Sequence, residues 1–97
     1  MLIEVHDEAR LELLEARDFY DGGRAGYGLR FAQAIEDEFQ LLLTYPRIGK
    51  QVGRRARSHV LADWPYSVIY QLKADSIFVV AIAHHAKRPE YWRPRLR

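Results

Sequence analysis

The sequence feature that most constrains the fold is an uninterrupted run of seven apolar residues, Ile77–Ala83. A strand with one exposed face alternates apolar and polar side chains, so a continuous apolar run indicates a strand covered on both faces. The run is far too short to cross a bilayer, which needs about 20 residues. Residues 76–84 are therefore predicted to form a central strand with other parts of the chain packed on each side.

Weaker patterns predict the neighbouring strands. Residues 66–73 form a predicted strand whose apolar face carries Val68, Tyr70 and Leu72. A tight turn at Ala74-Asp75 joins it to the central strand. A further strand is predicted over residues 55–62, and Trp64-Pro65 interrupts the chain after it. Two glycines within residues 47–53 indicate a loop there.

The first half of the chain begins with a short apolar segment, residues 2–5, which predicts another strand. Asp7 is the expected N-cap of a helix, and Glu8 in its first turn favours the helix dipole. One helical face is then apolar, through Ala9, Leu13, Ala16 and Tyr20. Asp21-Gly22-Gly23 is expected to end this helix, because glycine tolerates the left-handed conformation that closes helices.

A second helix is predicted over residues 27–45. One of its faces is apolar, with Gly28, Phe31, Ile35, Phe39 and Leu42. Pro46 ends it, since the residue before a proline avoids the helical conformation. The two helices form an antiparallel hairpin whose apolar faces need a partner surface. The predicted fold class is α+β, with an N-terminal strand and the hairpin packed on a small, mainly antiparallel sheet of about four strands.

Length and composition limit the kind of protein further. The 97 residues fit a single domain, residues 1–97, and their 48% hydrophobic content can build one core. Cysteine is absent, which excludes disulfides and thiolate metal sites and fits a reducing cytosol. The N-terminus shows no signal-peptide pattern. We therefore expect a cytoplasmic protein that neither enters a membrane nor depends on a metal or cofactor.

Charge is distributed unevenly along the chain. Residues 1–46 contain four arginines and ten acidic residues, whereas residues 47–97 contain eleven lysines or arginines and three acidic residues. The local balances of −6 and +8 give the overall net charge of +2. This asymmetry indicates a basic functional surface in the second half, although a solvated charged face without a partner is the simpler alternative.

Two basic clusters account for most of this charge. The first contains Arg47, Lys50, Arg54, Arg55 and Arg57. The second contains Lys87, Arg88, Arg93, Arg95 and Arg97, interleaved with Tyr91 and Trp92. Guanidinium groups bind phosphates and aromatic rings stack on bases, so this combination is typical of RNA binding.

Cutting RNA without a metal requires groups that move protons and groups that stabilise a crowded phosphate. The candidates for charge stabilisation are Arg55, Arg57 and Arg88. The candidates for proton transfer are His59, His84, His85 and Tyr91. Nothing in the sequence indicates a phosphate-binding glycine loop, a carboxylate pair or a nucleophilic serine.

Each candidate also has a plainer interpretation. His59 can simply face solvent from its strand. His84 and His85 are adjacent at a strand end, so they point to opposite faces and cannot easily share a metal. Tyr91 and Trp92 can pin the C-terminal segment onto the core instead of stacking on bases. The arginines can equally bind acidic groups of a protein partner.

The order and spacing of several motifs resemble the RelE/ParE toxin superfamily over nearly the whole chain. The matching segments are Ala9-Arg10, Phe31…Ile35…Leu42 leading to Pro46-Arg47-Ile48-Gly49, Trp64 to Tyr70, and Ile82 to Trp92. The resemblance implies a helical hairpin on a mainly antiparallel sheet. It also implies a cognate antitoxin whose flexible tail wraps and neutralises the toxin.

Members of this superfamily differ in target. RelE-like members cleave messenger RNA on the ribosome with basic residues and a C-terminal tyrosine, whereas ParE-like members poison DNA gyrase. Ser67 stands where RelE-like members usually have an arginine, while Arg88 matches a basic residue after the last strand and Tyr91 approximately matches the tyrosine. The serine and the long helical hairpin both favour the ParE-like group.

We therefore expect a toxin that inhibits growth by binding a target such as DNA gyrase and is neutralised by an antitoxin. The alternative is a ribosome-dependent mRNA endoribonuclease, and a second alternative is a degenerate member that only binds an antitoxin. The candidate catalytic residues are Arg57, Arg88, Tyr91 and His85. The residues expected to contact the target or antitoxin are Arg54, Arg55, Lys87, Trp92 and Arg93.

Overall fold

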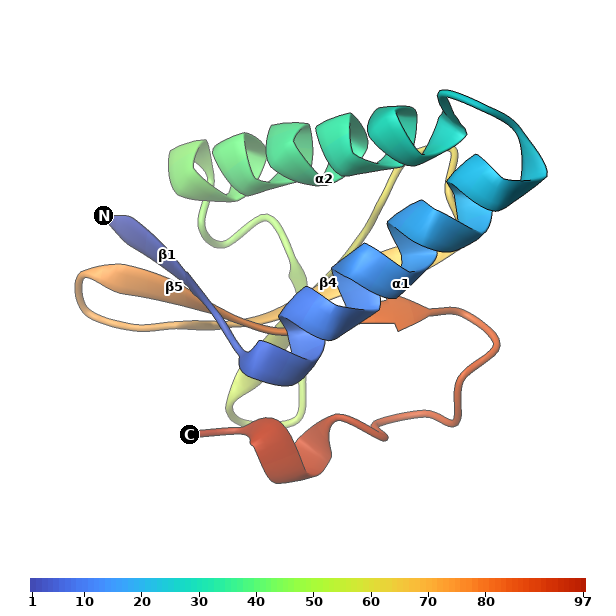
Figure 1. Ribbon diagram of the computed structural model, residues 1–97. Coiled ribbons are helices and arrows are strands. Elements are labelled where there is room, and N and C mark those ends of the chain that lie inside the picture. The colour runs from blue at the N-terminus through green and yellow to red at the C-terminus, as the bar shows by residue number, and fades with distance from the viewer.

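The computed structural model describes residues 1–97 as one sheet with two helices on one of its faces (Figure 1). The elements in chain order are β1 (Leu2–Val5), α1 (Asp7–Gly23), α2 (Tyr27–Thr44), β2 (Lys50–Val52), β3 (Ala56–Val60), β4 (Tyr66–Leu72), β5 (Ser76–His84) and a short 3-10 helix, η1 (Arg93–Arg95). The predicted α+β class and helical hairpin are confirmed. The sheet has five strands in the order β1-β5-β4-β3-β2. The extra strand is β2, which pairs with β3, so the prediction of a loop over residues 47–53 was wrong there.

The apolar run forms the centre of the sheet, as predicted. β5 lies between β1, which runs parallel to it, and β4, which runs antiparallel. Ile77, Val79 and Ile82 face the helices, whereas Phe78, Val80 and Ala81 face the opposite side. Pairing with β4 skips one residue between Val79 and Ala81, and this bulge places two consecutive side chains on the same face.

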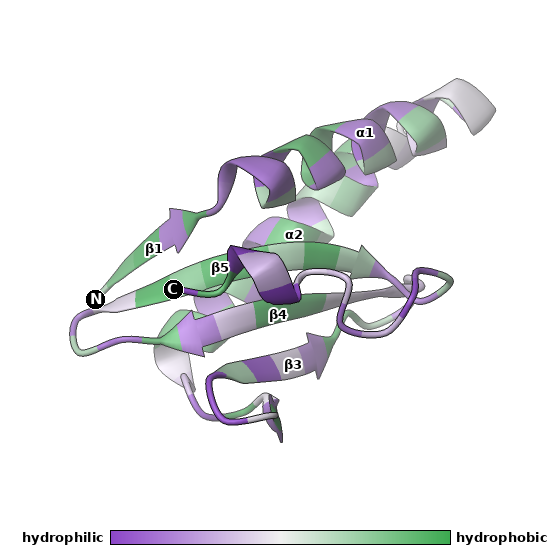
Figure 2. Ribbon diagram, turned by 90° about the horizontal axis from the view of Figure 1, so that it is seen from below, coloured by the Kyte–Doolittle hydropathy of each residue, from purple (hydrophilic) through white to green (hydrophobic).

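The face opposite the helices is covered by the C-terminal segment, residues 91–96. Figure 2 shows this segment crossing over β4 and β5, where both strands are hydrophobic. Trp92 is 5% exposed and belongs to the buried cluster on this face, with Tyr91 and Leu96 packed beside it. The central strand is therefore buried by helices on one side and by the end of the chain on the other.

The ends of the helices differ from the sequence prediction in two details. The N-cap of α1 is His6 rather than Asp7, because the His6 Nδ1 atom accepts the Glu8 amide at 3.0 Å. Gly22 and Gly23 lie within α1, and the left-handed residue is Gly26, with φ of 88°.

The connection between the helices is instead held by an aspartate. Asp21 Oδ1 accepts the backbone N–H groups of Gly26 and Gly28 at 3.0 and 3.3 Å. This side chain therefore satisfies amides at the start of α2, which has no side-chain cap of its own. At the other end, α2 stops at Thr44, just before the Tyr45-Pro46 pair, as expected.

Candidate interaction surfaces

The first basic surface surrounds the β2–β3 hairpin. A hollow of about 300 Å³ is lined there by Arg47, Gln51, Arg54, Arg55, Ala56, Arg57, Leu72 and Lys73. We call its five cationic side chains (Arg47, Arg54, Arg55, Arg57 and Lys73) the hairpin cluster. None of the five forms an ion pair with an aspartate or glutamate side chain, although Lys73 Nζ lies 3.4 Å from the main-chain oxygen of Arg97. Their charge is therefore available to an anionic partner.

Arg57 is the most firmly positioned member of the hairpin cluster. Its Nη1 atom donates to the carbonyls of Gly49 and Arg47 at 2.8 and 3.3 Å. Tyr70 fixes the same loop, since its hydroxyl accepts the Gly49 amide at 2.9 Å and donates to the Pro46 carbonyl at 2.7 Å. Burial raises the pKa of Tyr70, which keeps this hydroxyl protonated as a donor.

The second basic surface lies where the chain leaves β5. We call it the C-terminal hollow: about 200 Å³, lined by residues that include Ser67, His85, Lys87, Arg88 and Tyr91. The Ser67 hydroxyl lies 3.0 Å from His85 Nε2, close enough for a hydrogen bond. Ser67, which stands at the position of the RelE-like arginine, is therefore in contact with a histidine.

The two adjacent histidines point to opposite faces, as predicted from strand geometry. The ring of His84 packs edge-on against Tyr66, at 4.9 Å between centroids, on the helix side of the sheet. His85 contacts Ser67 on the other side and is exposed. Both residues line the C-terminal hollow, but the His84 ring packs on Tyr66 and its Nδ1 atom accepts the Ala86 amide at 2.9 Å. The exposed His85 is therefore the histidine that is more accessible to a ligand.

Most arginines of the second cluster are neutralised within the molecule. Arg93 pairs with Glu90, Arg97 Nη1 lies 3.4 Å from Glu4, and Arg95 Nη1 lies 2.9 Å from Glu12. Lys87 and Arg88 remain without an acidic partner. The second basic cluster therefore offers fewer unpaired charges than the sequence indicates.

Glu12 organises this region from α1, and nothing in the sequence pattern indicated its role. Its carboxylate accepts the Tyr91 hydroxyl at 2.5 Å and the Ile82 amide at 3.0 Å, in addition to two contacts from Arg95. Arg95 also donates to the Val80 carbonyl at 3.1 Å. Since β1 pairs with β5 only as far as Val79, Glu12 and Arg95 satisfy the backbone edge that β1 leaves open.

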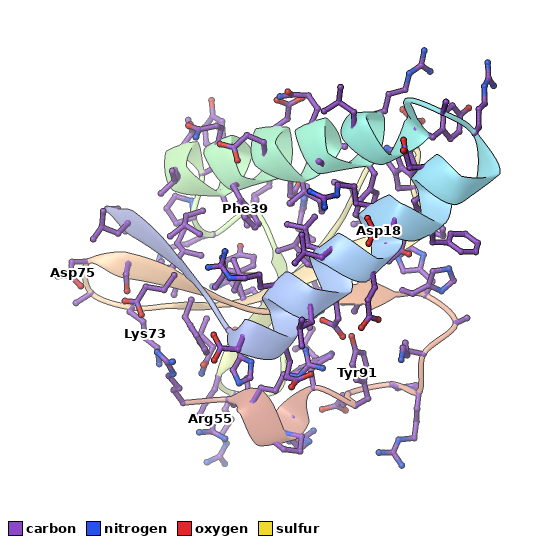
Figure 3. The ribbon with its side chains drawn as sticks, viewed as in Figure 1. Asp18, Phe39, Arg55, Lys73, Asp75 and Tyr91 are labelled. Carbon is purple, nitrogen blue, oxygen red and sulfur yellow. The ribbon has the colours of Figure 1, made fainter.

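Tyr91 and Trp92 both serve the fold. Tyr91 reaches from the C-terminal segment toward α1 (Figure 3), and burial, followed by its hydrogen bond to Glu12, raises the pKa of its hydroxyl. Trp92 is buried, so its indole presents little surface to a partner. The plainer interpretation, in which the pair pins the end of the chain to the core, matches their positions.

His59 faces the helices instead of solvent, contrary to the plainer interpretation of its strand position. Its Nδ1 atom lies 2.5 Å from Glu38 Oε2 on α2, and the Glu38 side chain is only 5% exposed. Desolvation raises the pKa of Glu38, while the contact with His59 opposes that rise. This pair links α2 to β3 and lies apart from both basic surfaces.

The structure therefore separates the candidate catalytic residues. His85, Arg88 and Tyr91 line the C-terminal hollow, whereas Arg57 lines the hairpin hollow, and the two hollows share no residue. Of the candidate contact residues, Arg54 and Arg55 line one hollow and Lys87 and Trp92 line the other. Arg93 lines neither hollow and pairs with Glu90.

Fold and surfaces together define a small α+β domain that presents basic surfaces at two places on its sheet. A family profile described as "ParE toxin of type II toxin-antitoxin system, parDE" matches residues 3–89. The chain therefore belongs to the ParE toxin family, and its identification as a RelE/ParE superfamily member is confirmed.

One solved structure shows the same fold. It is titled "Chromosomal ParDE TA system from P. aeruginosa", and the alignment has a TM-score of 0.66 with 18% identity, covering 87% of this chain and 95% of that chain. At this identity the likeness concerns the fold alone. No curated protein matches the sequence. Neither helix is long and apolar enough to cross a membrane.

Proposed function

We propose that this protein is a growth-inhibiting toxin that acts by binding a target such as DNA gyrase, and that a cognate antitoxin neutralises it in the cytoplasm. The observation that carries the proposal is the ParE family match over residues 3–89. The family is described as belonging to a toxin–antitoxin system, which supports an antitoxin partner for this chain. The unpaired hairpin cluster supports binding of an acidic partner.

Site geometry favours binding over catalysis. A metal-free nuclease needs a proton donor, a base and a cationic group around one phosphate. The Tyr91 hydroxyl already donates a hydrogen bond to Glu12, and Arg57 lies in a different hollow from Arg88. These residues are therefore better suited to contacting a macromolecule than to acting together on one bond.

The alternative function, ribosome-dependent cleavage of messenger RNA, has one observation in its favour. His85 and Arg88 line the same hollow, with Lys87 beside them, so a base and two cations are close together. Tyr91 would have to leave Glu12 to join them. This alternative predicts that Arg88→Ala abolishes toxicity without unfolding the protein.

Pulse-labelling after induced expression in bacteria without the antitoxin separates these functions. Early loss of DNA synthesis, together with inhibition of gyrase supercoiling by the purified protein, supports the proposal. Early loss of protein synthesis, with cleavage of ribosome-bound mRNA, overturns it in favour of the nuclease. If neither synthesis falls, the chain is a degenerate member that retains only antitoxin binding.

The expected contact residues can be tested with the same expression system. Arg54, Arg55, Lys87 and Arg93 are exposed, and we propose them as contacts to the target or antitoxin. Charge reversal at each hollow, followed by co-purification with the antitoxin and by growth assays, assigns each surface to one partner. A variant that loses co-purification but keeps toxicity identifies an antitoxin contact.

A further inference from the structure

A further hollow lies beside the hairpin cluster and belongs to neither proposed contact set. It measures about 830 Å³ and is lined by Met1, Thr44, Tyr45, Pro46, Arg47, Ile48, Leu72, Lys73 and Ala74. Its walls come from the end of α2, the loop after it and the β4–β5 turn. Tyr45 is 60% exposed and Ile48 is 43% exposed, so large apolar side chains face solvent here. Such a surface is suited to receive an apolar side chain of a partner.

This apolar hollow adjoins the basic hollow of the hairpin cluster. Arg47, Leu72 and Lys73 line both. No aspartate or glutamate lines either hollow. Figure 3 shows Lys73 beside the β4–β5 turn, on the side of the molecule where Arg55 also lies. The two neighbouring hollows together form a groove with an apolar end and a strongly cationic end.

We propose that this groove binds an acidic amphipathic peptide segment of a protein partner. An apolar side chain of the segment occupies the space between Tyr45, Ile48 and Leu72. Carboxylates that follow it in the segment pair with Arg54, Arg55 and Arg57. The proposed function is needed only to identify the partner as the antitoxin; the groove itself is defined by its own lining.

The composition of the groove favours a peptide over a nucleic acid. Single-stranded nucleic acids are held by several stacked aromatic side chains along a basic track. Tyr45 is the only aromatic residue that lines either hollow, and the apolar lining is otherwise Met1, Pro46, Ile48, Leu72 and Ala74, with Ala56 at the basic end. Aliphatic side chains next to arginines match leucine-like anchors next to carboxylates.

Arg57 adds preorganisation to the cationic end. Its Nη1 atom is held by two backbone carbonyls, so part of its side-chain entropy is already lost before binding. Planar guanidinium groups that are held in place donate two parallel hydrogen bonds to a carboxylate more readily than mobile lysines do. The flanking Arg54 and Arg55 are exposed and can adjust to the peptide.

The test uses the full-length protein and three fluorescein-labelled peptides in an anisotropy assay. The first peptide is Leu-Ala-Ala-Leu-Glu-Asp-Glu-Glu; the second replaces its leucines by serine, and the third replaces its acids by the corresponding amides. We expect the first to bind at least about tenfold more tightly than either of the others. A labelled thymidine oligonucleotide of equal length is the competing probe.

Protein variants locate the binding. Two variants, the double substitution Arg54→Glu/Arg55→Glu and the single substitution Ile48→Ser, should each weaken binding of the first peptide by about tenfold or more. Arg10→Glu/Arg17→Glu on the exposed face of α1 is the matched control and should leave binding unchanged. Circular dichroism confirms that each variant is folded.

Three results would overturn the proposal that the groove binds an acidic amphipathic peptide. One is failure of the first peptide to bind, and another is equal weakening by the α1 control. The third is tighter binding of the oligonucleotide that depends on Arg54 and Arg55 but not on Ile48. None of these assays measures growth, and the proposed toxin function is tested separately by pulse-labelling. Failure of the peptide-binding proposal is therefore distinguishable from failure of the proposed toxin function.

Discussion

The hydroxyl of Tyr91 donates a hydrogen bond to the carboxylate of Glu12, 79 residues earlier in the chain. This contact ties the C-terminal segment to α1 across the edge of β5. It gives Tyr91 a structural partner at the position where RelE-like relatives are expected to have a catalytic tyrosine. Its role can therefore be tested by removing only the hydroxyl.

Tyr91→Phe should leave toxicity intact while lowering the free energy of unfolding by about 1 kcal/mol, since one hydrogen bond is lost and the ring still packs. Urea denaturation measures the stability, and induced expression measures growth arrest. Lys87 and Arg88 are unchanged in this variant, so binding through the C-terminal hollow persists. Loss of toxicity in a folded Tyr91→Phe protein would instead support the nuclease.

Glu12→Ala should be far more damaging than the loss of any surface carboxylate. The Glu12 and Arg95 side chains are 17% and 15% exposed. Removing the carboxylate deprives the Ile82 amide of its hydrogen-bond acceptor and the Arg95 guanidinium of its ion-pair partner. Removing one partner of a buried ion pair costs about 3 kcal/mol or more. The difference in urea midpoint between this variant and the wild type measures the cost.

The matched control is Glu4→Ala, which removes an ion pair to Arg97 whose side chains are 53% and 60% exposed. Exposed pairs contribute about 0–1 kcal/mol, so this variant should remain close to wild-type stability. Similar losses in the two variants would show that Glu12 does not hold the edge of β5 as described.

Alkaline pH should unfold the protein through its buried and partly buried tyrosines. Burial, followed by the neighbouring Tyr20, raises the pKa of Tyr66 from its ordinary value of 10.0 to about 12, and burial also raises the pKa of Tyr70 and Tyr91. In each case the folded protein retains a proton that the unfolded chain loses. The contribution to stability is therefore complete below pH 10 and is lost as pH rises through the higher folded values.

Two titrations check this. Ultraviolet difference spectroscopy should show tyrosines that ionise only together with the loss of the circular dichroism signal. Denaturation at increasing pH should show falling stability above pH 10. Ionisation of all six tyrosines before any loss of structure would contradict the burial of Tyr66 and Tyr70 and the partial burial of Tyr91.

The fold was predictable where a periodic pattern records it. The apolar run of β5 and the spacing of Phe31, Ile35 and Leu42 report burial on a regular element, and the structure confirms both. β2 was missed because it has only three residues, of which Lys50 and Gln51 are exposed, so no alternation is visible. Its strand character comes from pairing with β3 rather than from its own sequence.

The surfaces were less predictable than the fold, because they depend on contacts between distant residues. Arg88 and Arg95 look alike in the sequence, yet Arg95 is neutralised by Glu12 from 83 residues away while Arg88 has no acidic partner. Likewise Trp92 lies in a basic, aromatic segment typical of RNA binding but is buried. Sequence spacing cannot distinguish such residues, since it contains no information about which charges meet.

Gly49→Ala should disturb the hairpin cluster without touching any of its charges. A Cβ atom at this position would lie 2.6 Å from the Tyr70 hydroxyl, too close for the loop to stay in place. The Gly49 amide and carbonyl bond to Tyr70 and Arg57, so both contacts must shift. We expect a loss of about 1–3 kcal/mol in unfolding free energy.

Gly22→Ala is the control for this substitution. Nothing lies within 4 Å of a Cβ atom at Gly22, and this residue is inside α1. Alanine is a better helix former than glycine, so this variant should gain up to about 1 kcal/mol. The Gly49 variant should also bind the acidic peptide less tightly, because Arg57 loses its fixed carbonyl partner. Unchanged peptide binding in a measurably destabilised Gly49→Ala protein would mean that the position of Arg57 does not contribute to the groove.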